Sequence, residues 1–572
     1  MAPGWDSEYV QSTCKVMPSN SPTEVLGAST GGDAAALEAQ FTDAVVAATQ
    51  VQSAVRLLED TACELVLTRR CADVCKVTHL LRTSGDRLSR AALEKFDTSV
   101  RTALDHIVAA PLPDTSYLQA TLGVKEGGLG LRRAVDLSLP AFVASATESR
   151  PAVFNLIRKF VEASVLPQSS FDEFDARLAL ARTRLWLSVP EGVASDLQSI
   201  VDEHADLAEK RFEAVSLGQT ARPDAADADA SQNSVSLLLQ PAGAEDPEHP
   251  TNVGGLQRAL SERIDNLRFD EIADTLLQLQ SWSSVRRLSE LRDPQVSHGW
   301  LWALNPAHGP RVRQDRFWTC LRIRLGVDII GDAVLCPRCN KQVLDTACVH
   351  ALCCAPGEST RGHNRTRDSA LQLVSAADPS AEVEVPGLIP DRPTLRPADI
   401  FTMAAIPGCQ AALDIGICSP DACGAGADCC ESMFQNKLET YGDHLEDLAS
   451  RGIRYKPLVF SCFGRPHPES YDTLEIIAKQ AARRHGVADF RPILRRALDH
   501  ITVAIWNRAA AMVHACLPEG SPEELGLLFG ECEEHSCAGD DADGSDDDMG
   551  ESSGETPGTS AHADLSTGGA GN

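Results

Sequence analysis

Two acidic residues stand on neighbouring predicted strands in the C-terminal half of the chain. Asp399 follows Pro397-Ala398 at the start of a short strand, and Asp414 lies inside the apolar segment 411–418. A carboxylate in a buried strand is costly unless it is paired or bound to a metal. If the two strands form a hairpin, both carboxylates converge on one edge, where they could bind Mg²⁺ or Mn²⁺. Such a metal holds phosphate and activates water, which is the chemistry of a phosphodiester hydrolase.

Three further residues could complete this candidate site. Lys437 follows on a predicted helix and would stabilise charge that develops on a phosphate. Tyr441 lies four residues later, on the same face of that helix, as a supporting group. Glu384 could complete the metal shell. The alternative interpretation is structural: Asp399 would cap a turn and Asp414 would form a salt bridge.

A compact Cys/His cluster precedes the acidic pair. Cys336 and Cys339 form a Cys-x2-Cys pair, His350 follows, and Cys353 and Cys354 lie just beyond it. Three thiolates and an imidazole satisfy tetrahedral zinc in a closed, structural site. The alternative is a scatter of buried cysteines, and Cys348 and His363 are spare ligands. A second group is a weaker candidate for metal binding, because it lacks a Cys-x2-Cys pair and lies in a loop rich in Gly and Ala, and its role stays open: Cys418, Cys423, Cys429 and Cys430.

The charge of the chain restricts where nucleic acid could bind. The formal net charge is −29, and residues 517–572 contribute −15 of it, which leaves −14 for the rest. Any nucleic-acid surface must therefore be a local basic patch. One candidate comprises Arg361, Arg365 and Arg367, and a second comprises Arg311, Arg313, Arg316, Arg322 and Arg324. Runs of this kind are more often solvated helix faces.

A chain of 572 residues predicts several domains. Hydrophobic periodicity predicts a multidomain protein with a mainly α-helical N-terminal half, a small zinc knuckle, an α/β domain and a disordered acidic tail. The expected boundaries are 1–34 (loosely ordered), 35–217 (helical), 218–254 (disordered linker), 255–333 (helical, rich in Arg and Trp), 334–368 (zinc knuckle), 369–516 (α/β) and 517–572 (tail). The sequence shows no signal peptide and no apolar run long enough for a bilayer, so we expect an intracellular protein that does not enter a membrane.

Several motifs together resemble the C-terminal part of non-LTR (LINE-type) retrotransposon polyproteins. They are the Cys/His block, Arg361-Gly-His-Asn-Arg-Thr-Arg-Asp368, Arg396-Pro-Ala-Asp399, Ala412-Leu-Asp-Ile415, Lys437-x3-Tyr441 and Tyr455-Lys-Pro-Leu-Val-Phe460. In that family a CCHC knuckle precedes a restriction-enzyme-like endonuclease of the PD-(D/E)XK class. The family pattern His-x3-Cys favours Cys354 over Cys353 as the fourth zinc ligand. The N-terminal segments Ser12–Pro18, Lys76–Arg82, Phe96-Asp97 and Gly127–Arg132 are similar to the end of a reverse transcriptase and its thumb.

The resemblance implies a DNA-nicking role in target-primed reverse transcription, with DNA and element RNA as partners and a nuclear location. Two departures from the family pattern matter. The chain contains no Tyr-x-Asp-Asp, so we expect no DNA synthesis from it, and it looks like a truncated element or a partial gene model. Gly416 occupies the position of the usual motif lysine, and the resemblance assigns that lysine's role to Lys437 on the next helix.

Two rival hypotheses remain open from the sequence. The chain could be a non-enzymatic, zinc-dependent nucleic-acid-binding remnant of a retrotransposon protein, or a decayed fragment without selected function. The target sequence, the preference for DNA or RNA and the oligomeric state are not determined by the sequence.

Overall fold

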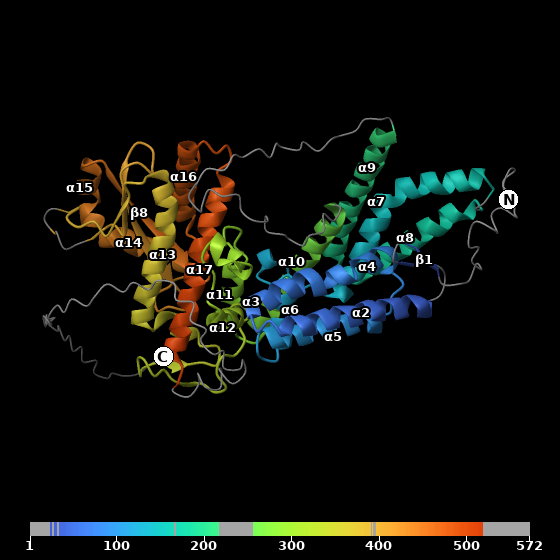
Figure 1. Cartoon of the computed structure of the whole chain (residues 1–572), viewed down its shortest axis with the longest axis horizontal. Coiled ribbons are helices and arrows are strands. Elements are labelled where there is room, and N and C mark those ends of the chain that lie inside the picture. The colour runs from blue at the N-terminus through green and yellow to red at the C-terminus, as the bar shows by residue number, and fades with distance from the viewer. Residues whose placement is uncertain are drawn as a thin grey trace, which may run out of the picture. The chain divides into compact units, whose positions relative to one another are not determined.

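The structure, a computed structural model, describes residues 23–25, 28–30, 34–164, 167–216, 255–389, 392 and 396–518. The chain divides into units Met1–Leu528 and Phe529–Asn572, and all described residues belong to the first. The predicted linker and nearly all of the predicted acidic tail lie outside the described residues. The described part is mostly helical with a small mixed sheet, which confirms the coarse prediction of fold class (Figure 1).

Helices form the described residues before the Cys/His module. They are α2 (Ala34–Arg56), α3 (Thr61–Leu67), α4 (Thr78–Ser84), α5 (Arg90–Ile107), α6 (Asp114–Thr121), α7 (Ala134–Glu162), α8 (Ser169–Leu187), α9 (Glu191–Ser216), α10 (Gly255–Gln278), α11 (Trp282–Leu291) and α12 (Gln314–Leu325). Strands β1 (Thr23–Val25) and β2 (Ala28–Thr30) pair before α2. None of the helices in the described ranges is long and apolar enough to be a candidate bilayer span.

The C-terminal elements surround a four-stranded sheet. Two short strands, β3 (Val334–Leu335) and β4 (Val343–Leu344), precede α13 (Pro356–Ala377). The sheet order is β5 (Glu382–Val383), β6 (Ile400–Thr402), β7 (Gln410–Cys418), β8 (Ile453–Ser461). The remaining helices are α14 (Cys429–Thr440), α15 (Leu445–Ser450), α16 (Pro468–His485) and α17 (Arg491–Cys516).

The sheet register sets the candidate site. Strands β6 and β7 are antiparallel, with Ile400 opposite Leu413, so continuing the register by one residue places Asp399 opposite Asp414. Strands β7 and β8 are parallel, which requires a crossover connection, and α14 and α15 lie in that connection. The sequence pattern predicts one helix over 433–451, and this prediction is wrong, because α14 ends at Thr440 and a 3-10 turn over Gly442–His444 separates it from α15.

Side chains alternate between the two faces of β7, and the two faces have different neighbours. Ala411, Leu413 and Ile415 pack in a core with α13, α16 and α17. The residues between them point to the opposite face, because successive side chains of a strand alternate. Asp414 and Gly416 therefore face α14, the helix that carries Lys437. All of β7 is largely buried, which confirms the predicted central strand.

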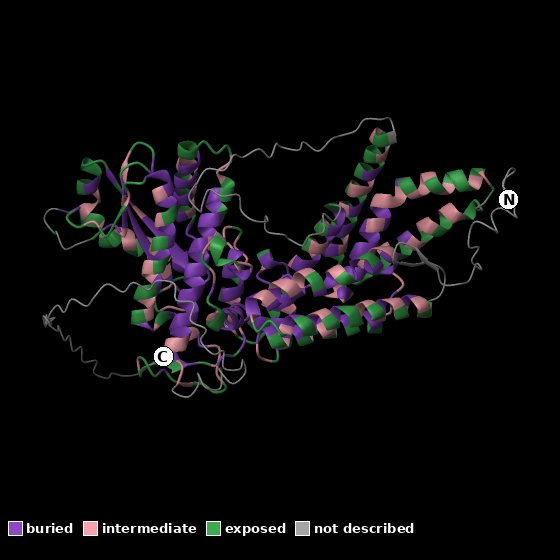
Figure 2. Ribbon diagram, viewed as in Figure 1, coloured by how far each residue is buried: buried purple, intermediate pink, exposed green. Residues whose placement is uncertain are grey.

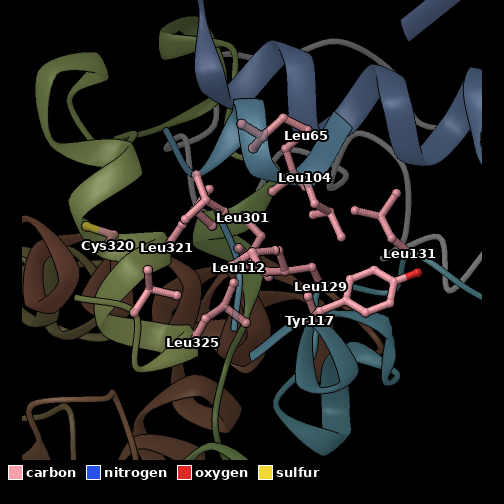
Figure 3. Packing of buried hydrophobic residues seen from close by; sticks show 14 of the residues in the cluster. Leu65, Leu104, Leu112, Tyr117, Leu129, Leu131, Leu301, Cys320, Leu321 and Leu325 are labelled. Atoms are coloured by element: carbon pink, nitrogen blue, oxygen red, sulfur yellow. The ribbon is translucent and has the colours of Figure 1, made fainter. Parts of the chain in front are cut away.

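Helix α17 is buried along most of its length and joins two cores (Figure 2). Ile501 and Ile505 belong to the core beneath the sheet, whereas Trp506 and Met512 belong to a larger core shared with α12 and the N-terminal helices. Trp300 stacks on Trp506 with ring centroids 4.5 Å apart. Part of the larger core is drawn in Figure 3, with its labelled members being Leu65, Leu104, Leu112, Tyr117, Leu129, Leu131, Leu301, Cys320, Leu321 and Leu325.

Candidate active site and metal centre

The two predicted carboxylates are neighbours at the junction of β6 and β7. Asp399 accepts a hydrogen bond from the Ile415 amide at 2.6 Å through Oδ2, and its Oδ1 lies 3.2 Å from His363 Nε2. Asp414 Oδ1 accepts a hydrogen bond from the Lys437 ammonium at 2.6 Å, and its Oδ2 accepts one from the Tyr455 hydroxyl. The carboxylates are thus oriented from four sides, by α13, β7, α14 and β8.

The environment separates the acidities of the two carboxyl groups. Burial raises the pKa of Asp414, and the attraction of Lys437 and the hydrogen bond from Tyr455 only partly offset it. Burial also acts on Asp399, but the hydrogen bond and charge of His363 and the Ile415 amide lower its pKa overall. A pair of interacting carboxyl groups with acidities displaced in opposite directions is a common feature of hydrolytic sites.

Gly416 provides the space through which Lys437 reaches Asp414. A Cβ at position 416 would lie 2.7 Å from Lys437 Cε, 3.2 Å from Met433 Cγ and 3.3 Å from Val459 Cγ2. The space that a side chain at position 416 would take is therefore filled by the Lys437 side chain from α14. The side chains of Lys437 and Asp414 are only 18% and 11% exposed, so this ion pair is largely shielded from water.

Tyr441 and Glu384 lie at the periphery of the pair. Tyr441 is the C-cap residue of α14, and its hydroxyl donates to the Arg396 carbonyl oxygen at 2.9 Å. Its ring lies 4.9 Å from that of Tyr455. Glu384 donates its amide to the Asp399 carbonyl oxygen at 3.1 Å. The Glu384 carboxylate forms ion pairs with Arg367 and Arg396, so in this arrangement it faces two guanidinium groups.

Two members of the site were not predicted as such. His363 was a spare zinc ligand in the sequence interpretation, yet it bonds Asp399. The spacing of residues 363 and 367 could have indicated this role, because residues one helical turn apart lie on the same face. His363 contacts Asp399, and Arg367 contacts Glu384. Tyr455 begins the motif Tyr455–Phe460, and its contact with Asp414 depends on the parallel register of β7 and β8, which the sequence does not reveal.

The four predicted zinc ligands gather into one group. The ligand atoms of Cys336, Cys339, His350 and Cys354 all lie within 4.8 Å of one another. Cys339 Sγ is 3.3 Å from His350 Nε2, and Cys336 Sγ is 3.6 Å from Cys354 Sγ. Three thiols and an imidazole at this spacing fit a structural zinc ion. The spare residues Cys348, Cys353 and His363 lie outside the group.

Local structure explains the geometry of this metal centre. Cys336 and Cys339 lie in the turn between β3 and β4, and His350 lies in a 3-10 turn over Val349–Cys353 that Cys354 follows. Hydrogen bonds from the amides of Gln342 and Lys341 lower the pKa of Cys339 to about 6, which favours the thiolate that a metal requires.

The predicted basic residues divide into exposed and buried ones. Arg361 and Arg365 are exposed on α13, one turn apart, whereas the Arg367 side chain is only 12% exposed and pairs with Asp368 and Glu384. The second candidate patch is not a continuous surface, because Arg322 and Arg324 are buried and donate to main-chain carbonyls. Arg324 Nη2, for example, lies 3.0 Å from the Val124 oxygen. These two arginines bind α12 to residues 108–128.

A cavity of about 1210 Å³ lies between α17, the N-terminus of α10 and the segment 292–310. Its basic lining residues are Lys125, Arg258, Arg292, Arg491, Arg495 and Arg496, and its acidic ones are Glu126, Asp293, Glu475 and Asp499. Trp302, Tyr471 and Phe490 add aromatic surface.

Comparison with known proteins adds no identification. No protein-family model matches the chain, and no curated protein matches its sequence.

Proposed function

We propose that this chain is a metal-dependent DNA endonuclease with its active site at Asp399 and Asp414. One observation carries the proposal: the β6–β7 register brings the two carboxylates together, and Lys437 reaches Asp414 through the space left at Gly416. An acid pair with a lysine at the end of a mixed sheet is the arrangement that the resemblance to PD-(D/E)XK nucleases leads one to expect.

The side chains around Asp399 and Asp414 orient the two carboxylates for metal binding. Each of the four carboxylate oxygens has one protein partner (His363, the Ile415 amide, Lys437 or Tyr455), and a carboxylate oxygen has two acceptor sites. Asp399 and Asp414 would hold Mg²⁺ or Mn²⁺, which supplies an activated water and neutralises phosphate charge. His363 and Tyr455 fix the orientations of the two carboxylates. Lys437 would stabilise the charge that develops on the reacting phosphate.

The proposed substrate is DNA, cut on one strand. In the family that the motifs resemble, such a nick releases a 3′-hydroxyl that primes reverse transcription, and this role would place the protein in the nucleus. The zinc module continues directly into α13, whose exposed Arg361 and Arg365 would contact the phosphate backbone. The same two arginines would also contact the phosphate backbone of the element RNA.

The test uses the full chain loaded with zinc and incubated with supercoiled plasmid, with and without Mg²⁺ or Mn²⁺. We expect conversion to nicked circle that requires the metal and is lost in Asp414→Asn and Asp399→Asn. Asp447→Asn, an exposed acid on α15, is the matched control and should cut normally. Metal-dependent cutting that survives in both site variants would refute the assignment.

A second candidate function is non-enzymatic binding of nucleic acid through the zinc module. One observation favours it: each oxygen of Asp414 already has a protein partner, Lys437 or Tyr455, and the Glu384 carboxylate is held by two arginines. Under this alternative, a folded, zinc-loaded protein would bind DNA or RNA with a steep dependence on salt and would not cut in any divalent metal. Removal of zinc would abolish the binding.

A further inference from the structure

A second group of cysteines lies on the face of β7 that carries Asp414. Cys418 ends β7, and Cys429 and Cys430 begin α14. The three sulfur atoms all lie within 4.8 Å of one another, with Cys418 Sγ 3.8 Å from Cys430 Sγ. All three residues are buried. Cys423, the fourth member of the group considered from the sequence, is exposed and lies outside it.

The surroundings of this group differ from those of ordinary apolar cysteines. Buried free cysteines usually behave as small hydrophobic residues. Here a guanidinium nitrogen of Arg465 lies 4.0 Å from Cys429 Sγ, although Arg465 itself is buried. Glu290 also approaches, with Oε1 3.8 Å from Cys429 Sγ. Arg465 also pairs with the carboxylates of Glu290 and Asp428, so the three thiols lie beside a network of charged groups.

We infer that Cys418, Cys429 and Cys430 form a second, independent metal site that takes a thiophilic ion, with Zn²⁺ as the expected occupant. The three thiols would release their protons to solvent on binding, as zinc ligation requires. A Zn²⁺ ion with three thiolates would carry a net charge of −1, and it would lie beside the buried guanidinium of Arg465, which also pairs with Glu290 and Asp428. The three thiolates would occupy three of the four tetrahedral positions of the ion.

A metal at this position would link two elements of the candidate active site. Cys418 lies on the same face of β7 as Asp414 and Gly416, and Cys429 and Cys430 lie in the first turn of the helix that carries Lys437. A metal bound here ties the end of β7 to the start of α14. It therefore fixes the two elements that bring Asp414 and Lys437 together. The inference concerns metal binding and stands whether or not the protein cuts DNA.

Metal stoichiometry tests the inference on the full chain. Reduced protein is saturated with zinc, freed of excess metal and analysed by mass spectrometry for zinc per chain. We expect about two zinc ions for the wild type and about one for Cys418→Ser/Cys430→Ser. The control Cys423→Ser, in the same loop, should keep the wild-type value. A wild type with a single zinc that the double variant retains would overturn the inference.

Cobalt substitution of the wild type provides a measurement that does not depend on the folding of a variant. Thiolate-to-cobalt charge-transfer absorption grows with the number of thiolate ligands. Two sites of three thiolates each should give twice the absorption of the CCHC site alone, reached in two steps as cobalt is added. Saturation at one equivalent, with only the absorption of three thiolates, would contradict a second site.

Discussion

The contact between Gly416 and Lys437 lets us predict how Gly416→Ala and Lys437→Ala change stability, alone and together. A methyl group at position 416 would meet Lys437 Cε at 2.7 Å, so Gly416→Ala should expel the lysine from Asp414. Lys437→Ala removes both the ammonium and the atom that the new methyl would meet at the shortest distance, and leaves only the milder contacts with Met433 and Val459. The two substitutions therefore act on one interaction, and their effects should not add.

The magnitudes follow from the burial of the ion pair. Removing one partner of a buried ion pair lowers stability by about 3–5 kcal/mol. The side chains of Lys437 and Asp414 are 18% and 11% exposed, so we expect Lys437→Ala to lower the free energy of local opening by the smaller amount, about 3 kcal/mol. Gly416→Ala should cost about 2 kcal/mol, because the expelled lysine recovers some hydration. Combining both should cost little more than Lys437→Ala alone. The coupling energy is then about 2 kcal/mol.

Hydrogen exchange is the appropriate assay, because a chain with several cores is not expected to unfold in two states. Exchange of the β7 amides, followed by mass spectrometry of peptides covering 410–418, reports the free energy of local opening. Lys479→Ala, on α16, is the control and should leave β7 unchanged. Additive effects of the two substitutions, within about 0.5 kcal/mol, would refute the claim that Gly416 exists to admit Lys437.

Three further predictions concern pH, salt and metal. Burial raises the pKa of Asp97 to about 7, although it accepts a hydrogen bond from the Ala134 amide at 2.6 Å. The folded state then keeps a proton that the unfolded state releases above its ordinary pKa, so stability should fall as pH rises from about 4 to about 7, by about 4 kcal/mol in total. Asp97→Asn should remove this dependence of stability on pH, as measured by hydrogen exchange of α7. An unchanged dependence on pH in that variant would contradict the raised pKa of Asp97. Replacing Arg361 and Arg365 by Gln should weaken DNA binding equally for all sequences and reduce the slope of log affinity against log salt by about 2, whereas an unchanged slope would exclude α13 from the interface. Cys339→Ala should remove one zinc ion and raise hydrogen exchange throughout 334–354, and full retention of zinc would refute the CCHC site.

The sequence was most informative where spacing and periodicity determine structure. The Cys-x2-Cys pair and the His-x3-Cys half-knuckle are local patterns, and their four residues gather as predicted. The apolar run at 411–418 predicted a buried strand because no polar face interrupts it. Asp414, the exception in that run, marked the candidate site.

Long-range contacts explain what the sequence did not reveal. Tyr455 reaches Asp414 only through the parallel register of β7 and β8, and His363 reaches Asp399 from a helix that begins in the zinc module. The arginines of α12 appeared to be a surface patch because their burial depends on carbonyl groups some 200 residues away in sequence. Likewise, Cys418 was grouped with exposed Cys423 because their nearness in sequence does not reveal which thiols share a face.

The most direct measurement of the central claim is the nicking rate of supercoiled plasmid as Mn²⁺ is titrated, with DNA binding measured in parallel. The account predicts metal-dependent nicking by the wild type. It also predicts that Asp399→Asn and Asp414→Asn still bind DNA and zinc but cut at least about 100-fold more slowly. A folded, zinc-loaded wild type that binds DNA and never nicks it, at any Mn²⁺ concentration, would contradict the endonuclease and leave the nucleic-acid-binding function in its place.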